Sequence, residues 1–171
     1  SVFIDFKPGG GTTIGADLIA KSAPDGYNII MMLTAHAVNA SLMPKLPYDT
    51  VKDFAPVAIL MDDGPFIVAV NAEVPAKNFA ELIDYAKSNP NKITWASYGA
   101  SSSAMLYMGW LSNVRDVHFF NVPYKSAAPA FQAVVAGESQ LVVYSMGLTL
   151  QQVKAGKMKA LAINTPVRHP A

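Results

Sequence analysis

The chain has 171 residues, of which 51% are hydrophobic and 15% are charged, with a formal net charge of +1. This composition predicts a folded chain with a sizeable core, and the small net charge gives no electrostatic case for binding nucleic acid or an anionic membrane. Cysteine is absent, which excludes disulfides, thiolate zinc sites and cysteine nucleophiles.

Signals for a metal, a membrane span and export are also missing from the sequence. The three histidines, His36, His118 and His169, are far apart and match no metal-ligand spacing, so we expect no metal site and no cofactor. No apolar run approaches the roughly 20 residues that span a bilayer. The first residues, SVFIDFKPGGG, have neither the basic start nor the long apolar core of a secretory signal.

The first part of the chain alternates short apolar runs with turn residues. The run 27–33 (YNIIMML) is typical of a strand that is buried on both faces. The motif PGGG at 8–11 and the motif DDGP at 62–65 predict turns between such elements. The predicted strands are 2–6, 27–33, 54–61 and 66–71, and the predicted helices are 14–22 and 39–45.

The remainder of the chain repeats a β-then-α order with short connections. The segment 79–88 has the clearest helical pattern, because its apolar residues Phe79, Leu82, Ile83 and Ala86 form one stripe. The repeated order predicts an α/β fold with largely parallel sheets. The further predicted strands are 93–96, 117–122, 140–144 and 159–164, and the further predicted helices are 104–111, 127–136 and 148–155.

The glycine-rich segment PGGGTTIGAD invites a phosphate-binding interpretation. It lacks the Gly-Lys-Ser/Thr of a nucleotide phosphate loop, and it does not fit GxGxxG because Ile14 stands where the third glycine belongs. We therefore reject nucleotide binding at this segment. A tight turn that needs positive φ and a direct phosphate contact both stay open.

The serine turn, residues 97–103 (SYGASSS), follows the strand 93–96 and leads directly into a predicted helix. Small hydroxyl residues leave backbone N–H groups accessible, and the positive end of the helix dipole points toward the turn. Ligands of open α/β sheets bind at the carboxyl ends of strands, so the turn is a candidate site for a carboxylate or phosphate. The alternative is an ordinary exposed loop.

Other side chains near the predicted strand ends have two open interpretations. His36 follows the strand 27–33 and either faces a ligand or forms hydrogen bonds within its loop. Lys125 in the motif VPYKS is either the cation for an anionic ligand or a solvated turn residue. Among the aromatic residues around the serine turn, Tyr107 and Trp110 have the helical spacing of packing residues. Tyr98 lies in the turn itself and is the best candidate to present a ring to a ligand.

Five motifs occur along the chain in a fixed order. They are KPGGGTTIGADLIAKSAPDGY, HAVNASLMPKLPYDTVKDFAPVA, VPAKNFAELIDYAKSNPNKITWASYG, VPYKSAAPAFQAVVAGE and VKAGKMKALAINTPVR. Taken together, this series closely resembles the extracytoplasmic solute receptors of tripartite tricarboxylate transporters, the Bug receptor family. The resemblance covers essentially all 171 residues.

The resemblance implies an α/β fold of the type II periplasmic-binding-protein kind, in which crossover strands join two lobes. Residues 1–70 and 159–171 would form an incomplete first lobe, and residues 71–158 the second lobe. Receptors of this family are periplasmic and bind a small carboxylate without catalysis or cofactor. They then present their closed form to membrane permease subunits, which are therefore the expected partners.

The family's ligand loop falls on the serine turn, and its loop in the first lobe falls on Thr34 and His36. Tyr144 and Ser145 stand where the family often has Phe-Asp. The bulky Tyr98 and Tyr144 depart from the family pattern and point to a flat or aromatic acid. The ligand-binding residues that the resemblance implies are Thr34, His36, Ser97, Tyr98, Gly99, Ser101, Ser102, Ser103, Tyr144 and Ser145.

Family members begin with a strand and an earlier Pro-Gly-Gly loop, and roughly forty residues of this kind should precede Ser1, by the size of one βα unit plus a strand. We therefore expect a fragment, which also lacks C-terminal elements of the first lobe. Two other classes stay open. One is a serine hydrolase that uses Ser101, Ser102 or Ser103 as nucleophile, although GASSS is not G-x-S-x-G. The other is a scaffold or signalling module that keeps the fold without a ligand.

Overall fold

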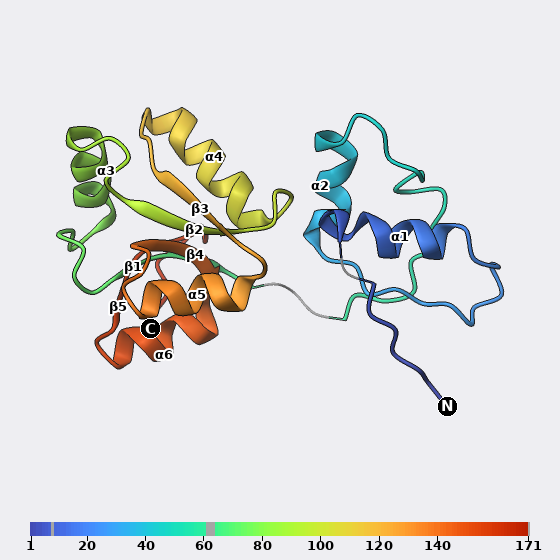
Figure 1. Ribbon diagram of the computed structural model, residues 1–171. Helices are drawn as coiled ribbons and strands as arrows, with labels where there is room; N and C mark the ends of the chain where they lie inside the picture. Colours follow the sequence, from blue (N-terminus) through green and yellow to red (C-terminus); the bar gives the residue numbers. More distant parts are fainter. Residues whose placement is uncertain (8, 61–63, 171) are drawn as a thin grey trace. The chain divides into compact units, whose positions relative to one another are not determined.

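The computed structural model describes residues 1–7, 9–60 and 64–170. The chain divides into two compact units, which Figure 1 draws as one ribbon. The first unit comprises Ser1–Leu60 and Ala100–Ser103, and the second comprises Met61–Gly99 and Ala104–Ala171. The predicted lobes, 1–70 with 159–171 and 71–158, follow a different division and stay a prediction.

One five-stranded sheet forms the centre of the second unit. Its strands are β1 (Phe66–Asn71), β2 (Thr94–Tyr98), β3 (Phe120–Tyr124), β4 (Leu141–Ser145) and β5 (Met158–Ile163), in the order β3-β2-β4-β1-β5. β2 runs parallel to β3 and β4, whereas β1 runs antiparallel to β4 and β5. The predicted α/β class is confirmed. The sheet is mixed, however, so the expected parallel pairing holds only among β2, β3 and β4.

Helices cover both faces of this sheet (Figure 1). They are α3 (Phe79–Ser88), α4 (Ser103–Arg115), α5 (Ala127–Val135) and α6 (Met146–Lys154). Val70 of β1 lies in a core with Leu82 of α3 and Met108 of α4. Its neighbour Ala69 lies in a second core with Phe131 of α5, because successive side chains of a strand point to opposite faces. The second unit is therefore a three-layer α/β/α structure.

A pair of hydrogen bonds joins the beginning of β1 to the end of β5. The Phe66 backbone N–H donates to Oδ1 of Asn164 at 2.7 Å, and the Asn164 backbone N–H donates to the Phe66 carbonyl at 3.1 Å. Phe66 is also the register partner of Ser145, the last residue of β4. This corner of the sheet thus lies beside the carboxyl end of β4.

The first unit contains short helices but no strand among its described residues. The helices are the 3-10 turn Gly10–Thr12, α1 (Thr13–Ala20) and α2 (Thr34–Leu42). Gly9, Gly10 and Gly11 have φ values of 125°, 58° and 61°, which glycine adopts readily. The predicted tight turn is confirmed for these three residues, while Pro8 lies outside the described residues.

The strands predicted at 2–6, 27–33 and 54–60 are wrong. Their apolar side chains are largely exposed, with Phe3 at 87%, Ile29 at 73% and Ile59 at 93%. A strand is stabilised by backbone hydrogen bonds to a neighbouring strand, and the described part of the first unit supplies no such neighbour. Residue 61 of the third predicted strand, and residues 62 and 63 of the predicted turn after it, lie outside the described residues.

The helix predicted at 39–45 begins earlier than expected. α2 starts at Thr34, directly after Leu33, whose φ of −112° and ψ of 178° are extended. Thr34 and His36 therefore belong to the first turn of a helix, and their predicted loop placement is wrong. The sequence HAVNAS has no strong breaker, so the helix extends back to the end of the preceding apolar run.

Candidate functional site

The carboxyl ends of three neighbouring parallel strands meet at one edge of the sheet in the second unit. Ser97 and Tyr98 are the last residues of β2, and Gly99 follows them. Tyr144 and Ser145 are the last residues of β4, which pairs with β2. The structure thus brings these five predicted site residues to the same edge, where open α/β sheets bind ligands.

Tyr98 is part of an aromatic group at this edge. Its hydroxyl donates to the Val143 carbonyl at 2.7 Å, and its ring centroid lies 6.0 Å from that of Tyr144. Tyr144 in turn stacks on Phe131, with centroids 4.5 Å apart and ring planes at 27°. The Tyr98 hydroxyl is therefore already paired with the main chain, and the two tyrosines are fixed by packing. Ser97, which is only 2% exposed, is buried within the strand.

The remainder of the serine turn belongs to the first unit. Ser101 is 3% exposed, and its hydroxyl donates to Oδ1 of Asn39. The Asn39 carboxamide N–H donates to the Gly11 carbonyl at 2.8 Å. Ser102 and Ser103, at the start of α4, are partly exposed. Inside the first unit, one buried amide therefore joins the serine turn to the glycine-rich turn.

Asn39 is a residue that sequence reasoning missed. It lies in α2 and is completely buried, although asparagine is mostly exposed in proteins. The motif HAVNAS gives one weak signal, since Asn39 stands between Val38 and Ala40. The two partners are 28 and 62 residues away, and local spacing does not reveal them.

His36 is held inside an aromatic cluster of the first unit. Its Nε2 lies 3.0 Å from the Thr50 carbonyl; a carbonyl only accepts, so Nε2 carries the proton. The imidazole stacks on Tyr48 at 5.8 Å and meets the edge of Phe54 at 4.9 Å. Burial raises the pKa of the Tyr48 phenol above its ordinary value. His36 thus connects α2 to the following segment, while Thr34 is exposed at the start of the helix.

The geometry does not favour a serine nucleophile at Ser101. A nucleophilic serine needs a neighbouring base that accepts its proton, and the acceptor at Ser101 is the neutral carboxamide of Asn39. The Nε2 of His36 is engaged with the Thr50 carbonyl, and its Nδ1 is buried with no hydrogen-bond partner among the described residues, so it accepts no serine proton. Across residues 1–7, 9–60 and 64–170, no group of three or more acidic or histidine side chains could hold a metal ion.

A family model described as the tripartite tricarboxylate transporter family receptor matches residues 1–171. The chain belongs to this receptor family. The resemblance stated from the sequence motifs is thereby confirmed.

Similar proteins include both curated relatives and solved structures. The chain is 32% identical over 169 residues to the UPF0065 protein in the tcbD-tcbE intergenic region of Pseudomonas sp. (strain P51), covering 99% of this chain and 50% of that protein. The R. palustris protein Rpa4515, solved with adipate, is 28% identical with a TM-score of 0.86, covering 98% of this chain and 56% of that one. MatC from Rhodopseudomonas palustris, solved with bound malate, is 31% identical with a TM-score of 0.82, covering 95% and 55%.

The chain spans about half the length of the curated relatives it matches. The family match itself extends over all 171 residues of this chain.

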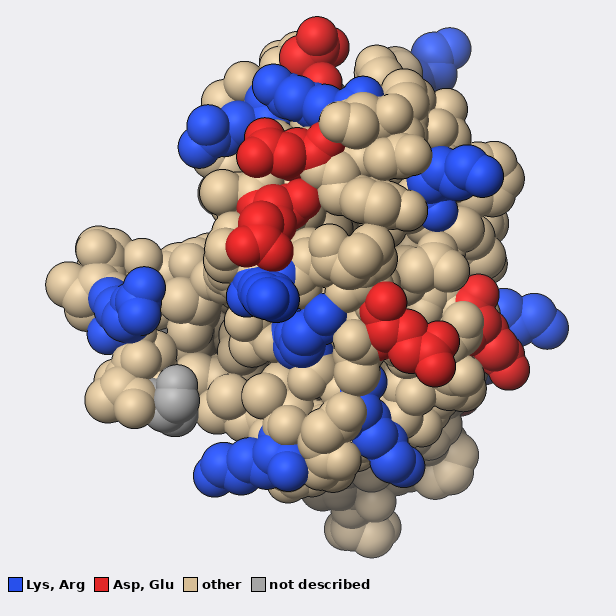
Figure 2. Space-filling view, turned by 90° about the vertical axis from the view of Figure 1, so that its left-hand side faces the viewer, with Lys and Arg blue, Asp and Glu red and all other residues tan. Residues whose placement is uncertain are grey.

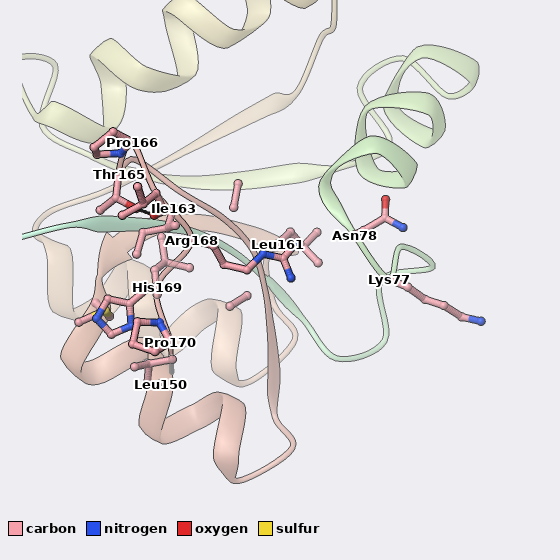
Figure 3. A pocket seen from close by; sticks show the side chains of 15 residues that line it. Lys77, Asn78, Leu150, Leu161, Ile163, Thr165, Pro166, Arg168, His169 and Pro170 are labelled. Carbon is pink, nitrogen blue, oxygen red and sulfur yellow. Dashed lines mark hydrogen bonds between the residues drawn. The ribbon is translucent and has the colours of Figure 1, made fainter.

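The second unit also has an open cavity of about 960 Å³ beside β5, shown in Figure 3. Its lining comes from β5, from α6, from Ile67 of β1, from residues 77 and 78 and from the C-terminal residues 165–170. Figure 3 shows the Lys77 ammonium pointing away from it. None of the predicted site residues lines this cavity, so the candidate edge and the cavity are separate features.

The charged side chains of the receptor form no large field of one sign on the face drawn in Figure 2, where Lys and Arg are interspersed with Asp and Glu. This agrees with the net charge of +1. Among the described residues, no helix is both long enough and apolar enough to cross a membrane.

Proposed function

We propose that this chain is part of an extracytoplasmic solute receptor that captures a small carboxylate for uptake. The observation that carries the proposal is the hydroxyl-rich turn between β2 and α4, at the carboxyl edge of the parallel strands. The relatives solved with adipate and with malate support the chemical class of the ligand.

The turn offers a carboxylate two kinds of donor. Ser103 is the first residue of α4, a helix of 13 residues, and Ser102 directly precedes it, so both hydroxyl groups lie at this end of the helix. The first N–H groups of a helix have no partner within the helix, and the helix dipole adds positive potential at that end. An anion can therefore be bound here by local donors. A strongly basic surface is not needed, which agrees with the net charge of +1.

We further propose that an aromatic or flat acid is among the ligands. Tyr98, Tyr144 and Phe131 form a continuous aromatic group at the carboxyl ends of β2 and β4. The Tyr98 hydroxyl is paired with the Val143 carbonyl. The rings would therefore contact a ligand through their apolar faces and edges. Aromatic surfaces of this kind prefer offset or edge contacts with another ring.

The proposal assigns the chain to the periplasm, as a binding protein without catalytic activity, whose partners are the membrane permease subunits of the transporter. Membership of the receptor family supports this assignment. The neutral amide partner of Ser101 also speaks against hydrolysis at that residue. Labelling with a serine-reactive phosphonate would contradict the assignment.

The experiment that tests carboxylate binding uses calorimetric titration with malate, adipate and benzoate. The 171-residue chain and a chimera are both titrated; in the chimera the chain replaces the matching segment of the malate-bound relative. We expect binding of at least one acid, weakened about tenfold or more in Ser102→Ala/Ser103→Ala, because two donors are lost.

The double variant Ser88→Ala/Ser112→Ala is the control, since it removes two hydroxyls from the ends of α3 and α4 and should bind like the native chain. If neither the chain nor a folded chimera binds any of the acids, the proposed function is wrong. Equal affinities for the two double variants would place the ligand elsewhere.

A further inference from the structure

We propose that Asn39 is a positioning residue for the ligand turn, which it fixes by holding Ser101 on one side and the Gly11 carbonyl on the other. The inference rests on the proposed function in so far as the serine turn binds the ligand. Asn39 itself is not assigned a contact with the ligand, because it is completely buried.

The contacts of Asn39 use both halves of its carboxamide. Its Nδ2 donates to the Gly11 carbonyl at 2.8 Å, and its Oδ1 accepts the hydroxyl proton of Ser101. Gly11 has a positive φ of 61°, and a Cβ atom added there would lie 3.5 Å from Oγ of Ser101 and 3.8 Å from Oδ1 of Asn39. The three residues therefore form one packed group within the first unit.

Few side chains could replace Asn39 at this position. An ionised aspartate accepts from Ser101 but has no proton to donate to the Gly11 carbonyl. Leucine has a similar size but offers neither a donor nor an acceptor, so the buried partners would lose their hydrogen bonds. Because Ser101 immediately precedes Ser102 and Ser103, a displaced Ser101 would also displace the donors that the proposed carboxylate needs.

Asn71 provides a matched control in the second unit. It is also buried, at 9% exposure. Its Nδ2 donates to the Val134 carbonyl at 2.8 Å, and its Oδ1 accepts from the Glu73 backbone N–H at 3.0 Å. Substitutions at Asn71 therefore remove the same kinds of contact from the protein without touching the serine turn.

The first measurement is amide hydrogen exchange of the unliganded 171-residue chain. We expect Asn39→Leu to raise the exchange rates of residues 9–12 and 100–104 by about tenfold or more, because the hydrogen bonds that order both turns are lost. Asn71→Leu should leave these rates unchanged and raise those near its own contacts. Unchanged exchange in both turns of Asn39→Leu would overturn the inference, whether or not any acid binds.

The second measurement is the affinity for malate, in whichever protein of the calorimetric experiment binds it, as a function of pH. In Asn39→Asp, a buried carboxylate lies beside the anion site and should weaken binding about tenfold or more at pH 8. A protonated carboxyl, like an amide, offers one donor and one acceptor. The ratio of variant to native affinity should therefore recover toward one as the pH falls to about 5.

Tyr48, whose phenol faces both Asn39 and Asp17, and the carboxyl groups of malate are present in both proteins, so the ratio reports the effect of the new carboxyl group at position 39 together with its immediate neighbours. Asn71→Asp should show a ratio near one at every pH. A ratio for Asn39→Asp that stays flat with pH would overturn the positioning role. If the native protein and the chimera bind no acid, the proposed function fails, and hydrogen exchange alone decides whether Asn39 orders the turn.

Discussion

Tyr98 shows that a predicted ligand residue can have a second role in the packing of the sheet. Its hydroxyl crosses to the neighbouring strand β4 and donates to the Val143 carbonyl at 2.7 Å. Its ring packs against both cores of the second unit. The bond fixes the orientation of the ring at the carboxyl edge, and it also contributes to stability.

Tyr98→Phe tests this contribution. The substitution keeps the ring but leaves the Val143 carbonyl without its phenol donor, so the free energy of unfolding should fall by about 1 kcal/mol. Urea denaturation measures the change. Tyr27→Phe is the control, because Tyr27 is 90% exposed and should lose almost nothing. Equal losses in the two variants would show that the Tyr98 hydroxyl contributes no net stability.

Whether the role of a single residue could be predicted depended on how far away in the sequence its hydrogen-bond partners lie. The sequence pointed to the serine turn because its hydroxyl residues are consecutive at a strand end. It did not point to Asn39, whose partners Gly11 and Ser101 come from two distant turns. It also placed His36 in a loop, whereas the helical first turn of α2 and the Thr50 carbonyl determine its position.

At the scale of elements, α3 was predicted with its observed bounds because its signals are local. The Asn78 side chain accepts from the Glu81 backbone N–H at 2.9 Å, which satisfies one of the unpaired donors at the start of a helix. Glu81 in turn accepts from the Lys77 backbone N–H at 2.8 Å. A capping residue, an acidic residue three positions later and an apolar stripe all fall within a few residues of each other.

Asn78→Ala should destabilise the protein by about 1 kcal/mol, since the cap is lost and alanine offers no acceptor. Thermal unfolding followed by circular dichroism measures the effect as a lower melting temperature. Asn113→Ala, at an exposed position within α4, serves as the control and should be neutral or slightly stabilising. A melting temperature that does not change in Asn78→Ala would mean that the cap contributes nothing.

The strands predicted in the first unit failed for a reason that is not local. The apolar run 27–33 has the composition of a buried strand, yet Ile29 is 73% exposed. Composition and alternation describe the strand itself, but a strand also needs a neighbour for its backbone groups. In the second unit, β1 through β5 supply neighbours for one another, and each predicted strand there has a counterpart within a few residues.

For the molecule as a whole, the burial of apolar side chains predicts where stability resides. Leu141, at the centre of the sheet, is completely buried, so Leu141→Ala should lower the free energy of unfolding by about 2–5 kcal/mol. Ile59 in the first unit is 93% exposed, and Ile59→Ala should cost no more than about 0.5 kcal/mol. Chemical denaturation of both variants measures these values. Comparable losses would show that Ile59 is packed in solution.

The corner formed by Phe66 and Asn164 has a mechanical consequence. β1 and β5 are antiparallel, so the chain enters the sheet at Phe66 and leaves it after Ile163 at the same end of their shared ladder. A tensile force applied through these two points would not load all the ladder bonds together. It would open them one after another like a zipper, and the two hydrogen bonds between Phe66 and Asn164 would be the first to break.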